Sequence, residues 1–166
     1  MLPPMTNEWL VTVGGYSAIM SQRAWATWNT YESIDYDAAG EVADYLGVLA
    51  VREHSILVLG GDPRPVLAFR KNEQLWIGRW FWAESDADAL NELLAFNVGP
   101  SICSVEWATT GEDYVLVDTA LTARYLRGCP KQPHAVGVLS GRYRIETHHV
   151  EPNEKTWLLA HSFHRL

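Results

Sequence analysis

The sequence predicts a β-rich α+β fold, a single domain of mainly antiparallel strands with two to three short helices. About ten short segments are rich in β-branched and aromatic residues and are separated by turn residues. Two longer segments have the apolar spacing of an amphipathic helix. The 166 residues contain no internal repeat or low-complexity tract, which indicates one domain. We expect a flexible leader over residues 1–8 and the folded domain over residues 9–166.

The N-terminal segment predicts a hairpin. Trp9–Val13 and Tyr16–Met20 are short strand-like segments on either side of Gly14-Gly15, a turn signal. The next segment, Ser21–Trp28, fits either a short helix or a loop anchored by aromatic residues.

A helix is predicted over Asp37–Leu46. Asp35 or Asp37 can cap its start, and Gly47 occupies the position where a left-handed residue ends a helix. Apolar residues at helical spacing define the buried face, namely Ala38, Val42, Tyr45 and Leu46.

Four strands are predicted after this helix, with turn residues between them. They are Val48–Val51, Ser55–Leu59, Val66–Arg70 and Leu75–Ala83. The last of these is apolar on both faces apart from Arg79, which is typical of a central strand covered on both sides.

A second helix is predicted from about Asp86 to Phe96. Ser85 has the N-cap position and Asp88 the third helical position of a capping box. Its apolar stripe consists of Leu90, Leu93 and Leu94.

The C-terminal part predicts five further strands, of which the last two form a long hairpin. The strands are about Cys103–Trp107, Tyr114–Asp118, Val136–Leu139, Arg142–Val150 and Thr156–Phe163. If Glu151–Lys155 is the loop and Val150 faces Thr156, the residue numbers of cross-strand partners sum to 306. The odd-numbered face, which includes Trp157, is then mostly apolar, as expected for a half-buried hairpin.

Patterns for metal binding are weak. His148 and His149 are adjacent on a strand and therefore point to opposite faces. With His161 and His164 they form no ligand set of standard spacing. We expect no metal and no cofactor.

The two cysteines do not predict a disulfide framework, and free thiols indicate a reducing compartment. Cys103 lies in an alternating strand, as an inert buried thiol does. Cys129 has cationic neighbours that can lower the pKa of a thiol, so an enzyme that uses Cys129 or a histidine stays open. The sequence places no histidine beside Cys129, and we expect no catalytic residue.

Charge and hydropathy exclude other classes. A net charge of −7 and a pI near 5.3 disfavour nucleic acid as a partner. No apolar run reaches the roughly 18 residues of a membrane helix, and no secretory signal is visible. We therefore expect a cytoplasmic protein without membrane association. Its charge is uneven, since residues 80–123 contain eight acidic residues and no Lys or Arg.

The first candidate binding surface is the polar face of the first predicted helix, with Asp37, Glu41 and Asp44. At helical spacing each pair of these carboxylates costs roughly 0.2–0.5 kcal/mol. A face that opposes helix stability in this way suits a basic partner. The alternative is an ordinary solvated acidic face.

The second candidate surface joins the aromatic strand to the acidic residues after it. Trp76, Trp80 and Trp82 share the even-numbered face of that strand. Burial on both sides explains them without a partner; the other interpretations are an interface ringed by carboxylates, or a pocket in which tryptophans stack on a small molecule or glycan. The candidate contact residues are Trp80, Trp82, Glu84, Asp86, Asp88 and Glu92.

Five segments, taken in order, are similar to those of a known family. They are Trp9–Gly15, Ile34–Gly47, Leu57–Pro63, Arg79–Ala83 and the closing hairpin from Gly141-Arg-Tyr-Arg through Trp157-Leu-Leu159. Together they resemble the immunity protein 21 family of bacterial polymorphic-toxin systems, from about Trp9 to the C-terminus.

The resemblance implies a mostly β protein that neutralises a toxin encoded beside it. It supplies no catalytic motif, since an immunity protein acts by binding alone, either by covering an active site or by blocking a substrate channel. Many toxin domains of such systems are cationic nucleases. The resemblance therefore implies a non-catalytic inhibitor whose partner is a cognate, cationic toxin domain.

Overall fold

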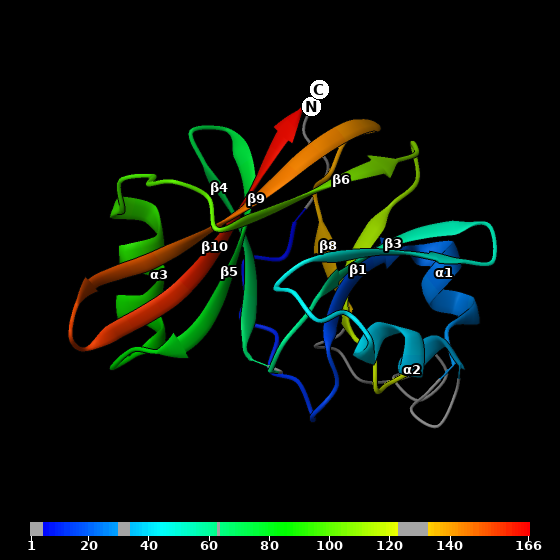
Figure 1. Cartoon of the computed structure of the whole chain (residues 1–166), viewed down its shortest axis with the longest axis horizontal. Helices are drawn as coiled ribbons and strands as arrows, with labels where there is room; N and C mark the ends of the chain where they lie inside the picture. The colour runs from blue at the N-terminus through cyan, green and yellow to red at the C-terminus, as the bar shows by residue number, and fades with distance from the viewer. Residues whose placement is uncertain (1–4, 30–33, 63, 123–132) are drawn as a thin grey trace.

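Two five-stranded antiparallel sheets form the centre of the protein (Figure 1). The computed structural model describes residues 5–29, 34–62, 64–122 and 133–166. The first sheet contains, in spatial order, β2 (Gly47–Val51), β3 (His54–Leu59), β1 (Ser17–Ser21), β7 (Tyr114–Asp118) and β8 (His134–Val136). The second sheet contains β4 (Val66–Lys71), β5 (Gln74–Trp82), β10 (Thr156–Arg165), β9 (Gly141–Asn153) and β6 (Cys103–Thr109).

Three short helices complete the described part of the chain. They are α1 (Gln22–Thr27), α2 (Ile34–Gly40) and α3 (Asp86–Ala95). The predicted fold class, a β-rich α+β domain, is confirmed.

The inner faces of the two sheets share one hydrophobic core. It contains Ile19, Leu57 and Leu116 of the first sheet with Ile77, Ile145 and Phe163 of the second. Because side chains alternate along a strand, the residues between them point to the outer faces, which are apolar as well. Each sheet must therefore be covered on two sides, and its central strands are nearly continuous apolar runs.

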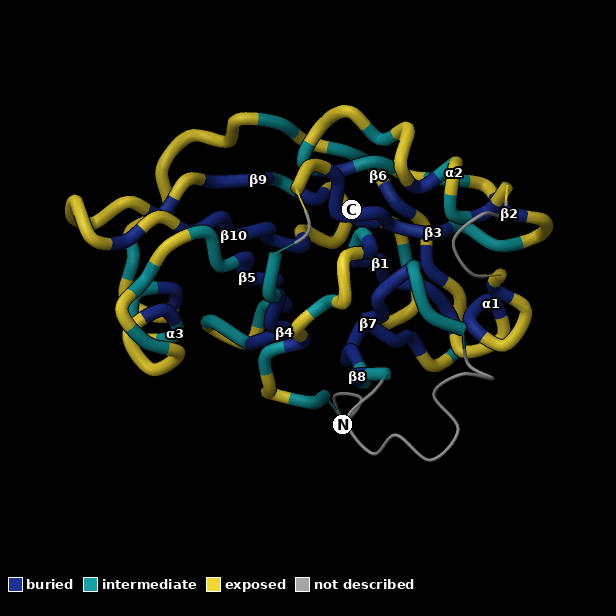
Figure 2. The backbone as a smooth tube through the Cα atoms, turned by 90° about the horizontal axis from the view of Figure 1, so that it is seen from below, coloured by how far each residue is buried: buried dark blue, intermediate teal, exposed yellow. Residues whose placement is uncertain are grey.

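The helices provide the outer cover. Residues of α1 and α2 pack on the outer face of the first sheet, and residues of α3 pack on that of the second. Figure 1 shows α1 and α2 on one side of the molecule and α3 on the other. In Figure 2 the strands are mostly buried, and exposed backbone is concentrated in turns and helix surfaces.

The bounds of the helix predicted over Asp37–Leu46 are wrong, since α2 begins at Ile34, ends at Gly40, and residues 41–46 form a loop. This loop packs against the ends of β2 and β3, where the Gly60 N–H donates to the Tyr45 carbonyl oxygen at 3.1 Å. A Cβ at Gly47 would lie 2.6 Å from Val42 Cγ1. Gly47 is therefore needed for the close approach of the loop to β2, not as the end of a helix.

The predicted N-terminal hairpin is also wrong. Within residues 9–13 only Leu10 forms a bridge, to Val66 of β4, while β1 pairs with β3 and β7. A Cβ at Gly15 would lie 1.9 Å from Asp118 Oδ1, and Asp118 Oδ2 accepts the Val13 N–H at 2.6 Å. Gly15 thus lets the chain approach the end of β7, while Gly14 supplies a positive φ of 116°.

Residues before the predicted domain boundary lie along β8. The Thr6 N–H donates to the Ala135 carbonyl oxygen at 2.9 Å, and His134 Nδ1 lies 3.1 Å from the Glu8 carbonyl oxygen. The division into a leader over 1–8 and a domain over 9–166 stays a prediction.

Serine residues cap two helices, whereas the predicted cap at Asp35 or Asp37 is wrong, since α2 begins at Ile34 and contains both aspartates. Ser21 caps α1 by accepting the Ala24 N–H at 3.1 Å, so the segment 21–28 is a short helix. The Ser85 side chain accepts the Asp88 N–H at 3.1 Å and starts α3 as predicted. On α3 the stripe differs, because Leu94 is 45% exposed and Ala89 is buried in its place.

The β9–β10 hairpin has a tighter turn than predicted. β9 continues to Asn153, which leaves only Glu154 and Lys155 in the turn, so most partners sum to 308 rather than 306. A shift of two residues keeps the side chains from Leu158 onward on their predicted faces, because the pairing parity is unchanged. The other strands lie within a few residues of their predicted ends, and the strand predicted at 136–139 lies at 134–136.

The close approach at Gly15 gives a test of the fold. Gly15→Ala places a Cβ against Asp118 and the Ala120 backbone, so we expect a loss of about 1–3 kcal/mol in the free energy of unfolding. Gly111→Ala is the matched control, because no atom lies within 4 Å of its Cβ position. Urea denaturation measures both, and equal stabilities would contradict the packing of Gly15 on β7.

Candidate functional site

The two candidate acidic groups lie beside different sheets. Asp37 is on α2, beside the first sheet, whereas Asp86 and Asp88 are on α3, beside the second. Figure 1 places α2 and α3 on opposite sides of the molecule. The structure therefore presents two separate acidic surfaces.

The first acidic group is not a helix face. Asp37, Glu41 and Asp44 are all exposed, but only Asp37 lies within α2. Because the helix ends at Gly40, the predicted repulsion between successive helical turns does not apply. These three residues still form an acidic surface. The helix destabilisation that singled them out as a binding candidate is absent.

The tryptophans of β5 become more exposed along the strand. Trp76 is 3% exposed and packs edge-on against Phe96 with ring centroids 5.5 Å apart. Trp80 is half-buried, with its ring 5.5 Å from that of Trp9. Trp82, the last residue of β5, is 64% exposed. Cover on both sides therefore accounts for Trp76 and partly for Trp80, but not for Trp82.

A second exposed tryptophan, which the sequence reasoning placed on a buried face, lies beside Trp82. Trp157 of β10 is the cross-strand partner of Trp82 and is 41% exposed. Its ring stacks on that of Phe81, with centroids 4.6 Å apart and planes at 25°. The pairing shifts between Trp157 and Leu158, so simple alternation fails there. The sequence signal for this exposure was the position of Trp157 directly after a hairpin turn.

Carboxylates lie next to this aromatic pair. Glu84 and Asp86 follow β5 directly and are exposed. Glu84 Oε1 lies 3.2 Å from Lys155 Nζ, which connects the start of α3 to the β9–β10 turn. Asp88 accepts a hydrogen bond from the Ser85 hydroxyl at 2.6 Å.

Three residues of the predicted second surface, Trp82, Glu84 and Asp86, thus lie beside two residues that were not predicted for it, Phe81 and Trp157. We call Phe81, Trp82, Glu84, Asp86 and Trp157 the aromatic end. Glu92 is half-buried and lines a different pocket with residues 149–152 of β9.

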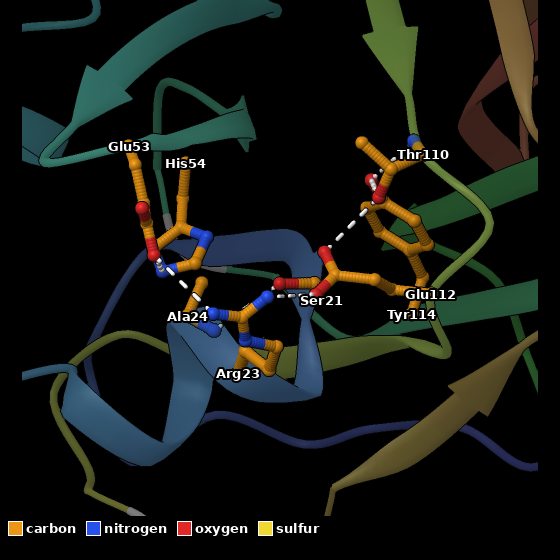
Figure 3. A network of polar contacts seen from close by, with 8 residues as sticks. All are labelled: Ser21, Arg23, Ala24, Glu53, His54, Thr110, Glu112 and Tyr114. Atoms are coloured by element: carbon orange, nitrogen blue, oxygen red, sulfur yellow. Dashed lines mark hydrogen bonds and ion pairs between the residues drawn. The ribbon is translucent and has the colours of Figure 1, made fainter.

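A polar network connects α1 to two turns of the chain (Figure 3). Arg23 lies 3.4 Å from Glu53 and 3.3 Å from Glu112, and Glu112 also accepts from the Thr110 hydroxyl at 3.0 Å. The Arg23 and Glu53 side chains are each 72% exposed, so these ion pairs contribute little stability. Arg23 thus bridges two carboxylates and holds the two turns near α1.

Arg79 is a buried charge on the inner face of β5. It is 1% exposed, and its Nη2 donates to the Asp62 carbonyl oxygen at 3.1 Å. Its Nε and Nη1 have no hydrogen-bond partner among the described residues. Burial lowers the pKa of Arg79 to about 10, and the charge of Arg64 acts in the same direction. Arg79 therefore remains protonated at neutral pH, at a cost in desolvation.

His161 lies on the same inner face, on the adjacent strand. It is fully buried, and its Nδ1 lies 2.8 Å from Thr147 Oγ1. Burial, and to a smaller extent the nearby Arg79 and His148, lower the pKa of His161 well below 6.5. The imidazole is therefore neutral at neutral pH, and its enclosure makes it a structural group.

Ser162 lies between two histidines, an arrangement that invites comparison with a nucleophilic site. Its Oγ lies 2.8 Å from His164 Nε2 and 3.1 Å from His148 Nε2. Glu146 approaches the same His164 nitrogen, at 3.4 Å, whereas in a catalytic triad the carboxylate contacts the other ring nitrogen. Ser162 is also fully buried. The cluster does not have the geometry of an activated nucleophile.

The remaining sequence candidates give no further site. Across residues 5–29, 34–62, 64–122 and 133–166, no group of three or more His, Cys, Asp or Glu side chains is placed to hold a metal ion. No described helix is long and apolar enough to cross a membrane. Cys103 is a free, half-buried thiol, which is less buried than predicted. Cys129 lies outside the described residues.

The fold and its surface are those of a β-rich domain that presents exposed aromatic residues beside carboxylates. A family model, Immunity protein 21, matches residues 8–156 of the 166-residue chain. The chain therefore belongs to the immunity protein 21 family, as the resemblance of its sequence segments predicted. No curated protein and no solved structure matches it.

His161 predicts a dependence of stability on pH. Its folded pKa is depressed, so below about pH 6.5 the unfolded chain binds a proton that the folded chain does not. The free energy of unfolding should then fall as pH decreases, by up to about 1.4 kcal/mol per pH unit. Urea denaturation between pH 7.5 and 5 should show a smaller fall for His161→Leu. The exposed His149 gives the control, His149→Gln, and a His161→Leu slope equal to wild type would contradict the prediction.

Proposed function

We propose that this immunity protein binds one cognate toxin domain and neutralises it by direct, non-catalytic occlusion. Membership of the immunity protein 21 family supports an immunity role. The net charge of −7 supports a cationic toxin domain as the partner, because opposite charge speeds encounter and disfavours wrong partners. We expect neither nucleic acid nor a membrane as a partner, and the cytoplasmic location stays a prediction.

The aromatic end is the surface that we propose for contact with the toxin. The observation that carries this proposal is the exposure of Trp82 and Trp157 as neighbours on adjacent strands. Tryptophan is enriched among the residues that dominate binding energy, which are surrounded by a polar rim. Glu84, paired with Lys155, and Asp86 supply such a rim, and Asp86 adds the charge that attracts a cationic partner.

The support beneath the aromatic end favours occlusion. β5 and β10 lie inside the second sheet, and the Phe81 ring stacks on Trp157. Aromatic side chains held in this way lose little conformational entropy on binding. A toxin docked there has its active site or substrate channel covered, which requires no reacting group from the immunity protein.

The second candidate function, a small-molecule or glycan module, needs Trp76, Trp80 and Trp82 to share a pocket. Trp76 is buried in the cluster under α3, Trp80 lies against Trp9, and Trp82 is mostly exposed. The three rings thus have different surroundings. We favour a protein partner for the exposed ring.

The immunity role is tested by co-purification with the product of the neighbouring gene at low and at raised salt. We expect a stoichiometric complex that weakens as salt rises, since screening reduces attraction between exposed charges. The purified complex should lack toxin activity in an enzyme or cell-rescue assay. No complex at low salt, or a complex with full toxin activity, would contradict the proposed function.

The contact surface is tested separately by substitutions. Trp82→Ala should weaken binding by about 30-fold, the effect of a loss of about 2 kcal/mol at an interface hot spot. Asp86→Lys should slow association at low salt more than Asp37→Lys, which makes the same charge change on the other acidic surface. Surface plasmon resonance measures both rates. If Asp37→Lys has the larger effect and Trp82→Ala has none, the contact lies near α2.

A further inference from the structure

A pocket of about 420 Å³ lies away from the aromatic end, where the β4–β5 turn and the end of β10 meet the segment before β9. Figure 1 shows the β4–β5 turn and the end of β10 on the same side of the molecule. Its volume is within the range of small-molecule sites, roughly 300–1,000 Å³. Its lining combines two arginines and other polar residues, among them the acidic Glu73, with an apolar floor.

Two arginines line this pocket and are held by backbone carbonyl groups. Arg70 Nη1 donates to the Glu73 carbonyl oxygen at 3.0 Å, and its Nη2 donates to that of Gly137. Arg165 Nη2 donates to the Ser140 carbonyl oxygen at 2.8 Å. These bonds fix the position of both guanidinium groups and leave further N–H donors on each.

Gly141 allows Arg165 to take its position. A Cβ at residue 141 would lie 2.9 Å from Arg165 Nε, so a larger residue would force the guanidinium to move. The backbone at Gly141 also has a positive φ of 154°. The local chain thus accommodates the arginine at the pocket.

Neither arginine is neutralised by a carboxylate. Among the described residues no Asp or Glu oxygen lies within ion-pair distance of Arg70 or Arg165, although the protein as a whole carries a charge of −7. Both charges act on the Tyr143 hydroxyl: burial raises the pKa of Tyr143, while Arg165 and Arg70 oppose that rise. Arg70, Arg165 and Tyr143 all line this pocket.

The floor of the pocket is apolar, and its side chains expose only a small part of their surface, with Tyr143 6% and Phe163 3% exposed. It is formed by Leu75, Val138, Tyr143 and Phe163, and the Tyr143 and Phe163 rings pack with centroids 6.2 Å apart. An inorganic anion would leave this floor without a contact. A ligand with both an apolar body and a negative group would use the floor and the arginines together.

We propose that this pocket binds a small organic carboxylate, whose carboxylate accepts hydrogen bonds from Arg70 and Arg165 and whose apolar body covers Tyr143 and Phe163. Arginine presents planar sets of donors that match a carboxylate. The site is independent of the proposed toxin contact, because its lining residues are not those of the aromatic end.

The proposal is tested with phenylacetate as the probe, titrated into the full chain by NMR and calorimetry. Phenylacetate should shift the signals of pocket residues and saturate. Phenylacetamide, its neutral analogue, should bind about tenfold more weakly, since it lacks the charge-assisted bonds. Acetate should also bind more weakly, since it lacks the body that covers the floor.

Substitutions locate the binding. Arg165→Gln should weaken phenylacetate binding at least about fivefold, and Arg165→Lys less so because it keeps the charge. Arg144→Gln is the control, since it removes one charge from an exposed residue of β9 outside the pocket. Arg70 also ties Gly137 to the sheet, so Arg165→Gln is the decisive variant. Equal binding of acid and amide, equal binding of acetate, or unchanged affinity in Arg165→Gln would overturn the proposal.

Discussion

Trp107 of β6 packs edge-on against Tyr114 of β7, with ring centroids 5.3 Å apart, and against Phe163 of β10. This contact joins strands of both sheets in one core, so neither sheet has a free inner face. The central strands also carry apolar side chains on their outer faces, which therefore require cover by helices. The two outer layers, α1 with α2 and α3 alone, follow from that requirement.

The aromatic end arises where this cover stops. Along β5 the same alternation that buries Trp76 under α3 leads to Trp82 beyond the reach of the helix. The chain then turns through Glu84 and Asp86 into α3. One strand therefore serves as core at its centre and as surface at its end, which places exposed aromatic rings on a rigid support.

Features that depend on neighbouring residues were predictable from the sequence. Features that depend on packing between distant segments were not. The caps at Ser21 and Ser85, and most strand bounds, depend on neighbouring residues alone. The helix predicted over 37–46 failed because the loop after Gly40 packs on β2 and β3, and Gly15 approaches Asp118, over a hundred residues away. Among the residues proposed for the toxin contact, Trp82, Glu84 and Asp86 were candidates from the sequence. Trp157 was not, because a register shift changes its exposure. Whether a side chain such as Trp157 is exposed depends on where the surrounding strands and helices end. A local sequence pattern does not contain that information.

The place of β10 in the second sheet also sets the order in which the protein can be completed during synthesis. β10 follows every other described strand in the chain, yet it lies between β5 and β9. Until it emerges from the ribosome, the pair β4–β5 and the pair β6–β9 have no strand to join them. Strands β1, β2, β3 and β7 can pair earlier. The nascent chain is thus expected to hold an unfinished sheet with exposed edges until β10 has been synthesised, and the aromatic end forms only then.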